Sequence, residues 1–512
     1  MNNRYLHIVV FVCGAAVLCI EILGTRILGP FYGVDIFLWS SLITVTLAAL
    51  SIGYIVGGRI ADTHASVNRL CRMILIAGLW MIAVPWLKHP VLDISEPLGL
   101  RAAILLSAFV LFFPPLMLLG TVGPFAIKLK TANLSKVGSI SGNLFALSTV
   151  GSVLSALATG FFLIPQIGVQ RLTLGVGFVL LITAIIGLLS NKKSAITTLT
   201  TLIVLPVIGF ILLQFAGERP APEEGLLAIE QSPYAELRVV DTDAGRHLLI
   251  DGGIHSLVDT STWESSLRYT AVMDLPKYFF KSPGTMLLIG LGGGSLVKQY
   301  AHASWNVDAV EIDPAVIRLA QTYFNLKPTE GNIYEMDGRR FISTTNNRYD
   351  VILLDAFGSS AIPFHLVTKE AFGLIAAHLT TQGIFALNVE TIGWNDPIIN
   401  NLASTLQHVF REVLVLPIEE PPNSFGNIIL LASDRKLEPV QEPERNVGLD
   451  PDWRYGPSYQ KVHAWDNRFT PRTNNTLVFT DDLNSIGLRA GEINLAARKD
   501  LHQYFQHTGM SW

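Results

Sequence analysis

The chain has 512 residues, of which 50% are hydrophobic and only 15% are charged, so it is neither an ordinary soluble protein nor a disordered one. Its net charge of −4 hides an uneven distribution: residues 1–216 hold 13 Lys and Arg against 5 Asp and Glu, and the remaining residues hold 24 against 36. An acidic second half argues against a nucleic-acid partner, since binding to nucleic acid needs a basic surface that replaces counterions.

Residues 1–216 predict a polytopic α-helical membrane domain. About 20 mostly apolar residues are enough to cross a bilayer as a helix. Seven segments qualify, at roughly 5–29, 36–57, 70–87, 102–126, 137–164, 172–190 and 196–215. In the fifth segment the small residues Gly151, Ser152, Ser155, Ala156 and Gly160 form one face, which predicts close packing against another helix.

Basic residues between these segments predict the orientation of the domain. They gather in alternate loops, at Arg59, Arg69, Arg72, Lys128, Lys130, Lys136, Lys192 and Lys193, whereas the other loops hold only Lys88, Arg101 and Arg171. The side richer in Lys and Arg is normally cytoplasmic. With seven spans, this rule puts the amino terminus inside and the residues after 216 outside.

The second half begins with a predicted linker at 217–232, followed by a small β-rich subdomain and a helix at 233–282. The linker is rich in Pro and charge. The tripeptides DAG at 243–245 and DGG at 251–253 are typical of turns in β-hairpins. A helical stretch is expected at about 262–280.

Residues 283–435 predict a doubly wound α/β domain, because apolar strands alternate with amphipathic helices along this segment. The strands are expected in 285–289, 307–311, 333–336, 349–354 and 383–390. Ligands in such folds bind at the carboxyl ends of the strands. Residues 436–512 form a carboxyl-terminal extension to which no chemistry is assigned.

Polar and glycine residues stand at those strand ends. Gly290, Gly292 and Gly293 follow the first strand, and Glu311 ends the second strand, where an acid can accept from both hydroxyls of a ribose. Asp337 is placed to accept from an adenine amino group, and Gly338 allows the base to come close. The combination predicts a nucleoside-containing ligand. A tight turn without ligand, a solvated strand-end acid and a turn aspartate are the alternatives for these positions.

The chain offers no pattern for a metal or a disulfide framework. Its three cysteines, Cys13, Cys19 and Cys71, all lie in the apolar part and form no CxxC pair. HExxH and clusters of His and Cys are also missing. We therefore expect no metal site and no tightly bound cofactor.

These motifs together resemble a known family. SPYAELRV, LLIDGGIHS, LLIGLGGGS, VEIDP, DGRRFI, YDVILLDAF and IPFHL, spread over about 230–435, resemble the spermidine synthases (polyamine aminopropyltransferases), with a weaker echo at FTDDLNS (479–485). EILGTRILGP, GYIVGGRIAD and LSTVGS in the apolar half resemble the bacterial relatives in which such a domain is fused to membrane helices.

The resemblance implies a class I methyltransferase-like domain that binds decarboxylated S-adenosylmethionine. Such an enzyme transfers the aminopropyl group to an amine and releases methylthioadenosine. Glu311 corresponds to the residue that holds the ribose, Asp337 and Gly338 to those at the adenine, and Asp355 to the proton acceptor. The implied location is the inner membrane, with the soluble domain in the cytoplasm, which conflicts with the loop charges of a seven-span chain.

Departures from the family leave the reaction open. Gly293 and Gly358 stand where the family has Asp, and Ser266–Arg268 stand where it has a Tyr-His-Glu or Tyr-Gln-Glu sequence. Tyr234, His255 and Arg268 are the remaining substrate-binding residues that we expect. The alternatives are a transferase that uses intact S-adenosylmethionine, as a methyl or aminocarboxypropyl donor, and a transporter or sensor that only binds a nucleoside. The acceptor is expected to be a small amine or a lipid-associated molecule, and homo-oligomerisation stays open.

Overall fold

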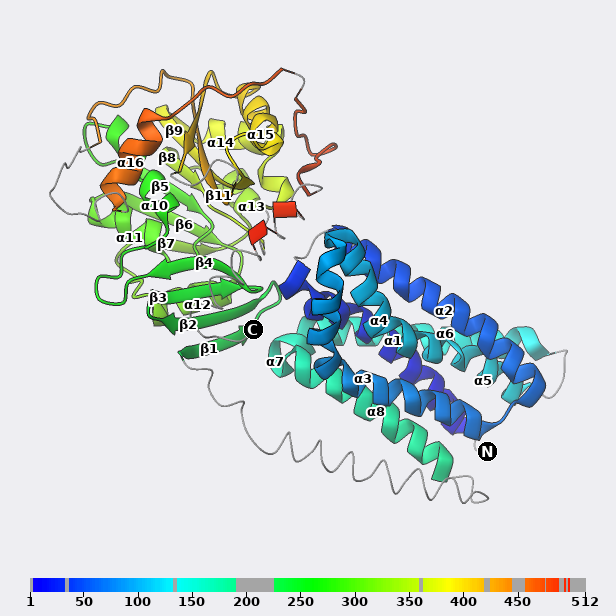
Figure 1. Cartoon of the computed structure of the whole chain (residues 1–512). Helices are drawn as coiled ribbons and strands as arrows, with labels where there is room; N and C mark the ends of the chain where they lie inside the picture. The colour runs from blue at the N-terminus through cyan, green and yellow to red at the C-terminus, as the bar shows by residue number, and fades with distance from the viewer. Residues whose placement is uncertain are drawn as a thin grey trace. The chain divides into compact units, whose positions relative to one another are not determined.

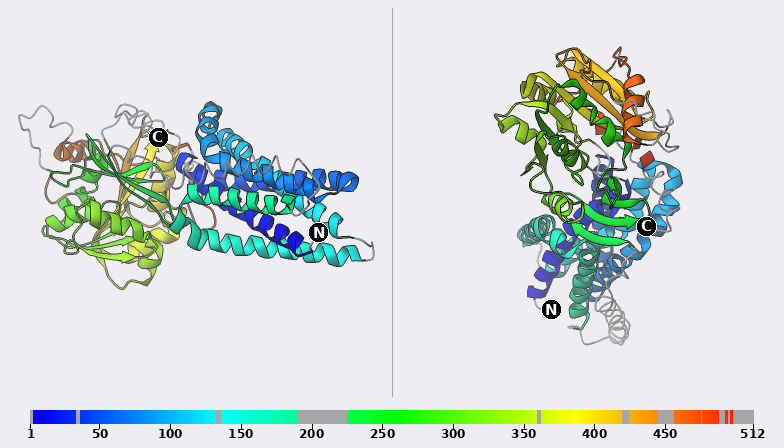
Figure 2. Two further views of the ribbon diagram at one scale, coloured as in Figure 1. Left: turned by 90° about the horizontal axis from the view of Figure 1, so that it is seen from below. Right: turned by 90° about the vertical axis from the view of Figure 1, so that its left-hand side faces the viewer.

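The computed structural model describes residues 3–32, 36–131, 136–189, 225–358, 362–418, 424–443, 456–474, 476–487, 492–493 and 496–497. The chain divides into two compact units, Met1–Pro222 and Glu223–Trp512, and each is described by itself (Figures 1 and 2). The first unit is helical, and the second contains both sheets.

Among its described residues, the helical unit contains six of the predicted long apolar helices. Its helices are α1 (Asn3–Tyr32), α2 (Ile36–His64), α3 (Val67–Ser95), α4 (Leu100–Gly120), α5 (Val122–Lys130), α6 (Val137–Ala158), α7 (Ile164–Ile167) and α8 (Val169–Leu189). Together they supply six stretches that are long and apolar enough to cross a membrane, two of which, Leu100–Lys130 and Val137–Leu163, join consecutive helical elements. The predicted seventh segment, 196–215, lies outside the described residues.

Close packing between α1 and α6 explains the row of small residues in the fifth segment. A side chain at Gly151 would place its Cβ 2.4 Å from the Phe11 carbonyl oxygen, and one at Gly14 would lie 2.4 Å from the Ser148 carbonyl oxygen. The Ser152 hydroxyl donates to the Gly14 carbonyl at 2.8 Å. The two backbones therefore approach through small residues, as the sequence predicts.

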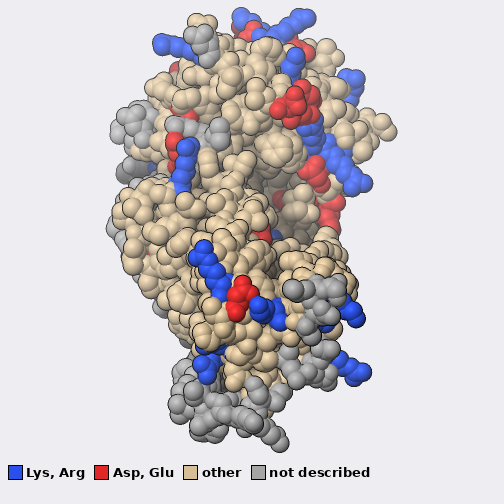
Figure 3. Space-filling view, turned by 90° about the vertical axis from the view of Figure 1, so that its right-hand side faces the viewer, with Lys and Arg blue, Asp and Glu red and all other residues tan. Residues whose placement is uncertain are grey.

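Large apolar side chains cover the outside of the helical unit. On α6 alone Phe145, Val153 and Leu157 are more than half exposed. Figure 3 draws both units from one side, and side chains other than Lys, Arg, Asp and Glu make up most of the surface that it shows. Such a surface is unusual for a soluble domain and matches the surroundings of a lipid bilayer.

The second unit begins with an antiparallel sheet of four strands in sequence order: β1 (Leu226–Gln231), β2 (Glu236–Thr242), β3 (Gly245–Ile250) and β4 (Gly253–Val258). The predicted DGG turn joins β3 to β4, and Asp251 and Gly252 both have positive φ angles, 46° and 80°. The linker was predicted too long, because β1 lies within 217–232. Alternate residues of β1 are half-buried where it pairs with β2.

A seven-stranded sheet follows, in the order β10-β11-β9-β8-β5-β6-β7. Its strands are β5 (Thr285–Ile289), β6 (Asn306–Glu311), β7 (Asn332–Glu335), β8 (Tyr349–Leu354), β9 (Leu379–Ile392), β10 (Glu412–Pro417) and β11 (Phe425–Ser433). The first five run parallel, and β11 and β10 add an antiparallel edge beside β9. The predicted doubly wound, methyltransferase-like fold is confirmed.

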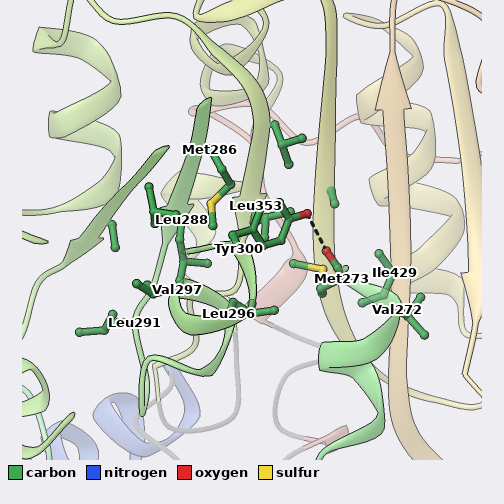
Figure 4. Packing of buried hydrophobic residues seen from close by; sticks show 14 of the residues in the cluster. Val272, Met273, Met286, Leu288, Leu291, Leu296, Val297, Tyr300, Leu353 and Ile429 are labelled. Atoms are coloured by element: carbon green, nitrogen blue, oxygen red, sulfur yellow. Dashed lines mark hydrogen bonds between the residues drawn. The ribbon is translucent and has the colours of Figure 1, made fainter. Parts of the chain in front are cut away.

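Helices cover both faces of this sheet. On one side lie α10 (Arg268–Val272), α11 (Ser295–His302), α12 (Pro314–Tyr323) and α16 (Pro457–Asp466); on the other lie α13 (Gly338–Thr344), α14 (Lys369–Ala377) and α15 (Pro397–Gln407). Alternation along β5 serves both layers, since Met286 and Leu288 point into the first core and Leu287 and Ile289 into the second. Figure 4 shows the first core, where the buried Tyr300 hydroxyl donates to the Met273 carbonyl at 3.1 Å.

The predicted helix at 262–280 is shorter than expected. It consists of α10 and a 3-10 helix at Leu275–Phe279. Residues 260–262 form a turn, and an isolated antiparallel bridge joins Val258 to Ser265, so the helix begins only at Arg268. Pro276 stands at the start of the 3-10 helix, where its fixed φ is tolerated.

Candidate active site

The glycine-rich turn joins the carboxyl end of β5 to α11 and lies against the end of β8. Gly290 has φ +94°, and a Cβ there would lie 2.3 Å from the carbonyl oxygen of Asp355. The Asp355 amide donates to the Ile289 carbonyl at 2.9 Å. Only glycine fits position 290, and its absent side chain lets the turn and Asp355 meet.

The same turn contacts the small sheet. The Gly293 amide donates to the Ser256 hydroxyl of β4 at 2.8 Å. A Cβ at Gly293 would lie 2.9 Å from Cδ1 of Phe324. The position that carries Asp in the resembling family is thus filled here by the ring of Phe324.

Glu311, at the end of β6, is turned toward the glycine-rich turn. Its carboxylate accepts hydrogen bonds from the amides of Leu291 at 3.0 Å and Asp313 at 2.9 Å. Burial raises the pKa of this carboxyl, and the amide hydrogen bonds partly offset that effect. The structure therefore brings Glu311 beside Gly290 and Gly292, as the sequence pattern predicts for neighbouring parallel strands.

Asp337 begins α13 as its N-cap, with Oδ1 accepting from the Arg340 amide at 2.9 Å. Its Oδ2 lies 2.9 Å from Nε2 of His365, a contact between side chains that the sequence motifs do not predict. Gly338 has no room for a side chain, because a Cβ there would lie 2.4 Å from Ile289 Cγ2. Asp337 therefore lies just after the end of β7, as predicted, and its side chain also has a structural role at the start of α13.

Tyr234 is half-exposed and faces the acids at these strand ends. Burial raises the pKa of its phenol first, and the charges of Asp313, Glu335, Asp337 and Glu311 raise it further. The phenol thus lies on the nucleoside side of the site. His255 is on β4, with its carbonyl 3.6 Å from the Cβ position of Gly292.

Asp355 lies just past the end of β8 in a polar cluster. Its Oδ1 accepts from the Asn388 amide group at 2.8 Å, and its Oδ2 accepts from the Tyr269 hydroxyl at 3.1 Å. Burial raises the pKa of Asp355 to about 6, although both hydrogen bonds lower it. Tyr269 directly follows Arg268, which the sequence analysis names as a substrate-binding residue.

A second carboxyl group, Glu390, lies close to this cluster. Burial, and then the charge of Asp355, raise the pKa of Glu390 to about 8. Its Oε2 is buried and has no hydrogen-bond partner among the described residues. Asn427 of β11 donates to Asn388 Oδ1 at 3.1 Å and continues the polar network. Sequence reasoning missed Tyr269, Asn388 and Glu390; the signal for the last two is a pair of polar residues two apart in an apolar strand.

The arrangement has two parts along one sheet edge. Glu311 and Asp337, at the ends of β6 and β7, are acceptors suited to the ribose and base of a nucleoside. Asp355, after β8, is a carboxylate with a pKa near neutrality, which suits a general base that takes a proton from an amine. The carboxyl group of Glu390 lies close to it. Among the described residues no group of three or more His, Cys, Asp or Glu is arranged to hold a metal ion.

Comparison with known proteins shows what this unit is similar to. Residues 267–438 match the spermine/spermidine synthase domain. The polyamine aminopropyltransferase of Moorella thermoacetica is 27% identical over 236 residues, which cover 44% of this chain and 79% of that protein. The enzyme of the same name from Vibrio vulnificus is 32% identical over 160 residues, covering 30% of this chain and 52% of that protein. The solved spermidine synthase of Thermotoga maritima aligns with 19% identity and a TM-score of 0.39 over 47% of this chain and 83% of its own.

Proposed function

We propose that the protein is a membrane-bound transferase that moves the aminopropyl group of decarboxylated S-adenosylmethionine to an amine. It would thereby take part in polyamine biosynthesis. The match of residues 267–438 to the spermine/spermidine synthase domain supports this proposal. One observation carries this proposal: Asp355 is held by Tyr269 and Asn388 next to the glycine-rich turn, with its pKa raised to about 6.

The donor would lie across the ends of β5, β6 and β7. Glu311 would accept from the ribose hydroxyls, and Asp337 from the amino group of the adenine. Gly290, Gly292 and Gly294 have positive φ angles, which favour glycine, and a ligand would approach the backbone of this turn.

Asp355 would supply the proton acceptor. An ammonium ion is not a nucleophile, so the acceptor must lose a proton before it reacts, and the Asp355 carboxylate takes that proton. The nitrogen lone pair then forms a bond to the methylene carbon next to the sulfonium, and the carbon–sulfur bond breaks with its electron pair going to sulfur. The sulfonium charge disappears and neutral methylthioadenosine leaves.

Glu390 would hold the acceptor. Its partnerless Oε2 lies in the same polar cluster as Asp355, and a bound ammonium would give this oxygen a donor. This carboxyl would partly replace the family acids that are missing at Gly293 and Gly358. The acceptor class that we propose is therefore a primary amine with a second cationic or polar end.

Intact S-adenosylmethionine is the second candidate donor. The Phe324 ring occupies the space next to Gly293, where the resembling family has the acid that meets the free ammonium of the decarboxylated donor. Without that acid, the selection against a donor carboxylate is weaker. The same adenosine contacts would serve either donor.

The location proposed is a bacterial inner membrane, with the second unit in the cytoplasm. Six described helices are long and apolar enough to span a bilayer by length and composition. Six crossings return the chain to its starting side, and the basic loop residues lie mainly on that side. A cytoplasmic unit has access to the donor metabolite.

Calorimetric titration of the full-length protein in detergent tests the proposal. Decarboxylated S-adenosylmethionine, intact S-adenosylmethionine and methylthioadenosine are compared, with Glu311→Ala and Asp355→Asn as variants. We expect the decarboxylated donor to bind at least about tenfold tighter than the intact one, Glu311→Ala to weaken all three, and Asp355→Asn to leave methylthioadenosine unaffected. Preference for the intact donor would favour the methyl or aminocarboxypropyl reaction, and binding of none would refute the nucleoside site.

A further inference from the structure

The carboxyl-terminal segment 479–486 lies against the nucleoside side of the site, although it comes well after residue 438, where the family match ends. Phe479 and Ile486 are buried in the core on the face of α13, α14 and α15. The Lys369 amide donates to the Phe479 carbonyl at 2.8 Å, and the Phe479 amide donates to Thr405 at 2.9 Å. The two ends of the segment are thus fixed to the domain.

Asp481 stands between these anchors and carries most of the polar contacts of the segment. Arg339 donates to both of its carboxylate oxygens, through Nη1 at 2.6 Å and through Nη2. The Thr368 hydroxyl donates to Oδ1 at 2.7 Å, and the Asp481 amide donates to Glu370 at 3.0 Å. The Arg339 guanidinium lowers the pKa of the Asp481 carboxyl, so the pair is ionic at neutral pH.

Arg339 connects this pair to the site. Its Nη1 also donates to the backbone carbonyl of His365 at 3.0 Å, while Asn484 donates to the neighbouring Phe364 carbonyl at 2.9 Å. The backbone at 364–365 is therefore held by Arg339 of α13 and by Asn484 of the carboxyl-terminal segment. The His365 side chain reaches Asp337 Oδ2 at 2.9 Å.

Asp337 keeps acceptor capacity after these bonds. An ionised carboxylate has about four lone-pair sites. One site takes the Arg340 amide and another takes His365. The remaining sites can accept from an amino group, and the two existing donors fix the carboxylate in one orientation.

We propose that segment 479–486 completes the nucleoside site: Asp481, through Arg339, positions His365, and His365 positions Asp337 to accept from the 6-amino group of a purine. The residues Asp481 and His365 are positioning residues that do not themselves touch the nucleoside. This inference rests on the proposed function, because it assumes a purine nucleoside at the strand ends.

The test compares the binding of 5′-methylthioadenosine and 5′-methylthioinosine to the full-length protein in detergent. The second nucleoside has a 6-oxo group in place of the amino group, so its 6-position accepts hydrogen bonds and cannot donate to Asp337. We expect the wild type to prefer the adenosine by about tenfold or more, the effect of one hydrogen bond to a charged group. Asp481→Asn and His365→Ala should each remove most of that preference by weakening adenosine binding alone.

Two controls make the outcome specific. Asp482→Asn removes the same charge one residue along and should leave both affinities unchanged. Glu311→Ala should weaken both nucleosides equally, because it acts at the ribose. If Asp481→Asn weakens both nucleosides equally, or neither, the inference is overturned while the proposed function stands.

The remaining outcomes test either the inference or the nucleoside site itself. A wild type that binds both nucleosides equally overturns the inference, since Asp337 then does not read the 6-position. A wild type that binds neither refutes the nucleoside site itself. Thermal unfolding midpoints identify a variant that fails to fold, and in that case His365→Ala, which removes no ion pair with Arg339, carries the test.

Discussion

At the scale of single residues, the environment of Asp355 sets the pH range in which it can act. Burial raises its pKa to about 6, so it is ionised at neutral pH and still basic enough to take a proton from an ammonium. We expect the turnover rate with saturating donor and acceptor to fall about tenfold per pH unit below pH 6. Asp355→Asn should lower turnover by about a hundredfold or more and remove this acid limb from the remaining activity.

Glu390→Gln provides the matched variant for that measurement. Because the pKa of Glu390 is raised to about 8, this residue is protonated where Asp355 ionises, and its replacement should leave the limb near pH 6 in place. Any change in turnover near pH 8, where Glu390 ionises in the wild type, should be absent from Glu390→Gln. An acid limb that persists in Asp355→Asn would assign it to another group.

The same residue makes a prediction about stability. The folded pKa of Asp355, about 6, lies above its ordinary value of 3.8, so folding is favoured when this carboxyl is protonated, and that contribution is lost as the pH rises from about 4 to about 6. Asp355→Asn should therefore stabilise the protein at pH 8, by roughly 3 kcal/mol. Thermal unfolding of both proteins at pH 8 and pH 4 measures this, and equal midpoints at pH 8 would contradict it.

At the scale of the elements, α1 and α6 depend on glycine at their contact. Gly151→Leu would push its side chain into the carbonyl of Phe11, so we expect a loss of about 2 kcal/mol or more. Gly142→Leu is the matched control. Gly142 lies on the same helix as Gly151, and a Cβ there would meet no other atom within 4 Å. Unfolding in detergent, followed by circular dichroism, should distinguish the two variants, and an equal effect of both would show that intrinsic helix propensity dominates.

The elements also show what a sequence can reveal. Glycines and acids at strand ends are local signals, and Gly290, Glu311, Asp337 and Asp355 indeed lie on one sheet edge. Tyr269, Asn388 and Glu390 join Asp355 only because α10 and β9 pack beside β8, and this pairing depends on tertiary contacts that no spacing in the chain encodes. Likewise β1 was assigned to the linker, since its six residues become a strand only by pairing with β2.

At the scale of the whole molecule, the number of crossings decides whether the proposed reaction has a donor. Reporter fusions after Leu189 and after Trp512 test this. The loop charges predict a cytoplasmic reporter after Leu189, the end of α8. The proposed function requires the reporter after Trp512 to be cytoplasmic as well. An external reporter at Trp512 would mean that the segment 196–215 crosses the bilayer and would separate the site from the cytoplasmic donor.

The bond between the Gly293 amide and the Ser256 hydroxyl couples the glycine-rich turn to the small sheet. It attaches the glycine-rich turn to the sheet whose first strand, β1, is the first described element after the helical unit. If a nucleoside orders that turn, it also stabilises the sheet, and thermodynamic linkage makes the effect reciprocal. Any ligand or partner that stabilises or strains the small sheet would then change nucleoside affinity by the same factor.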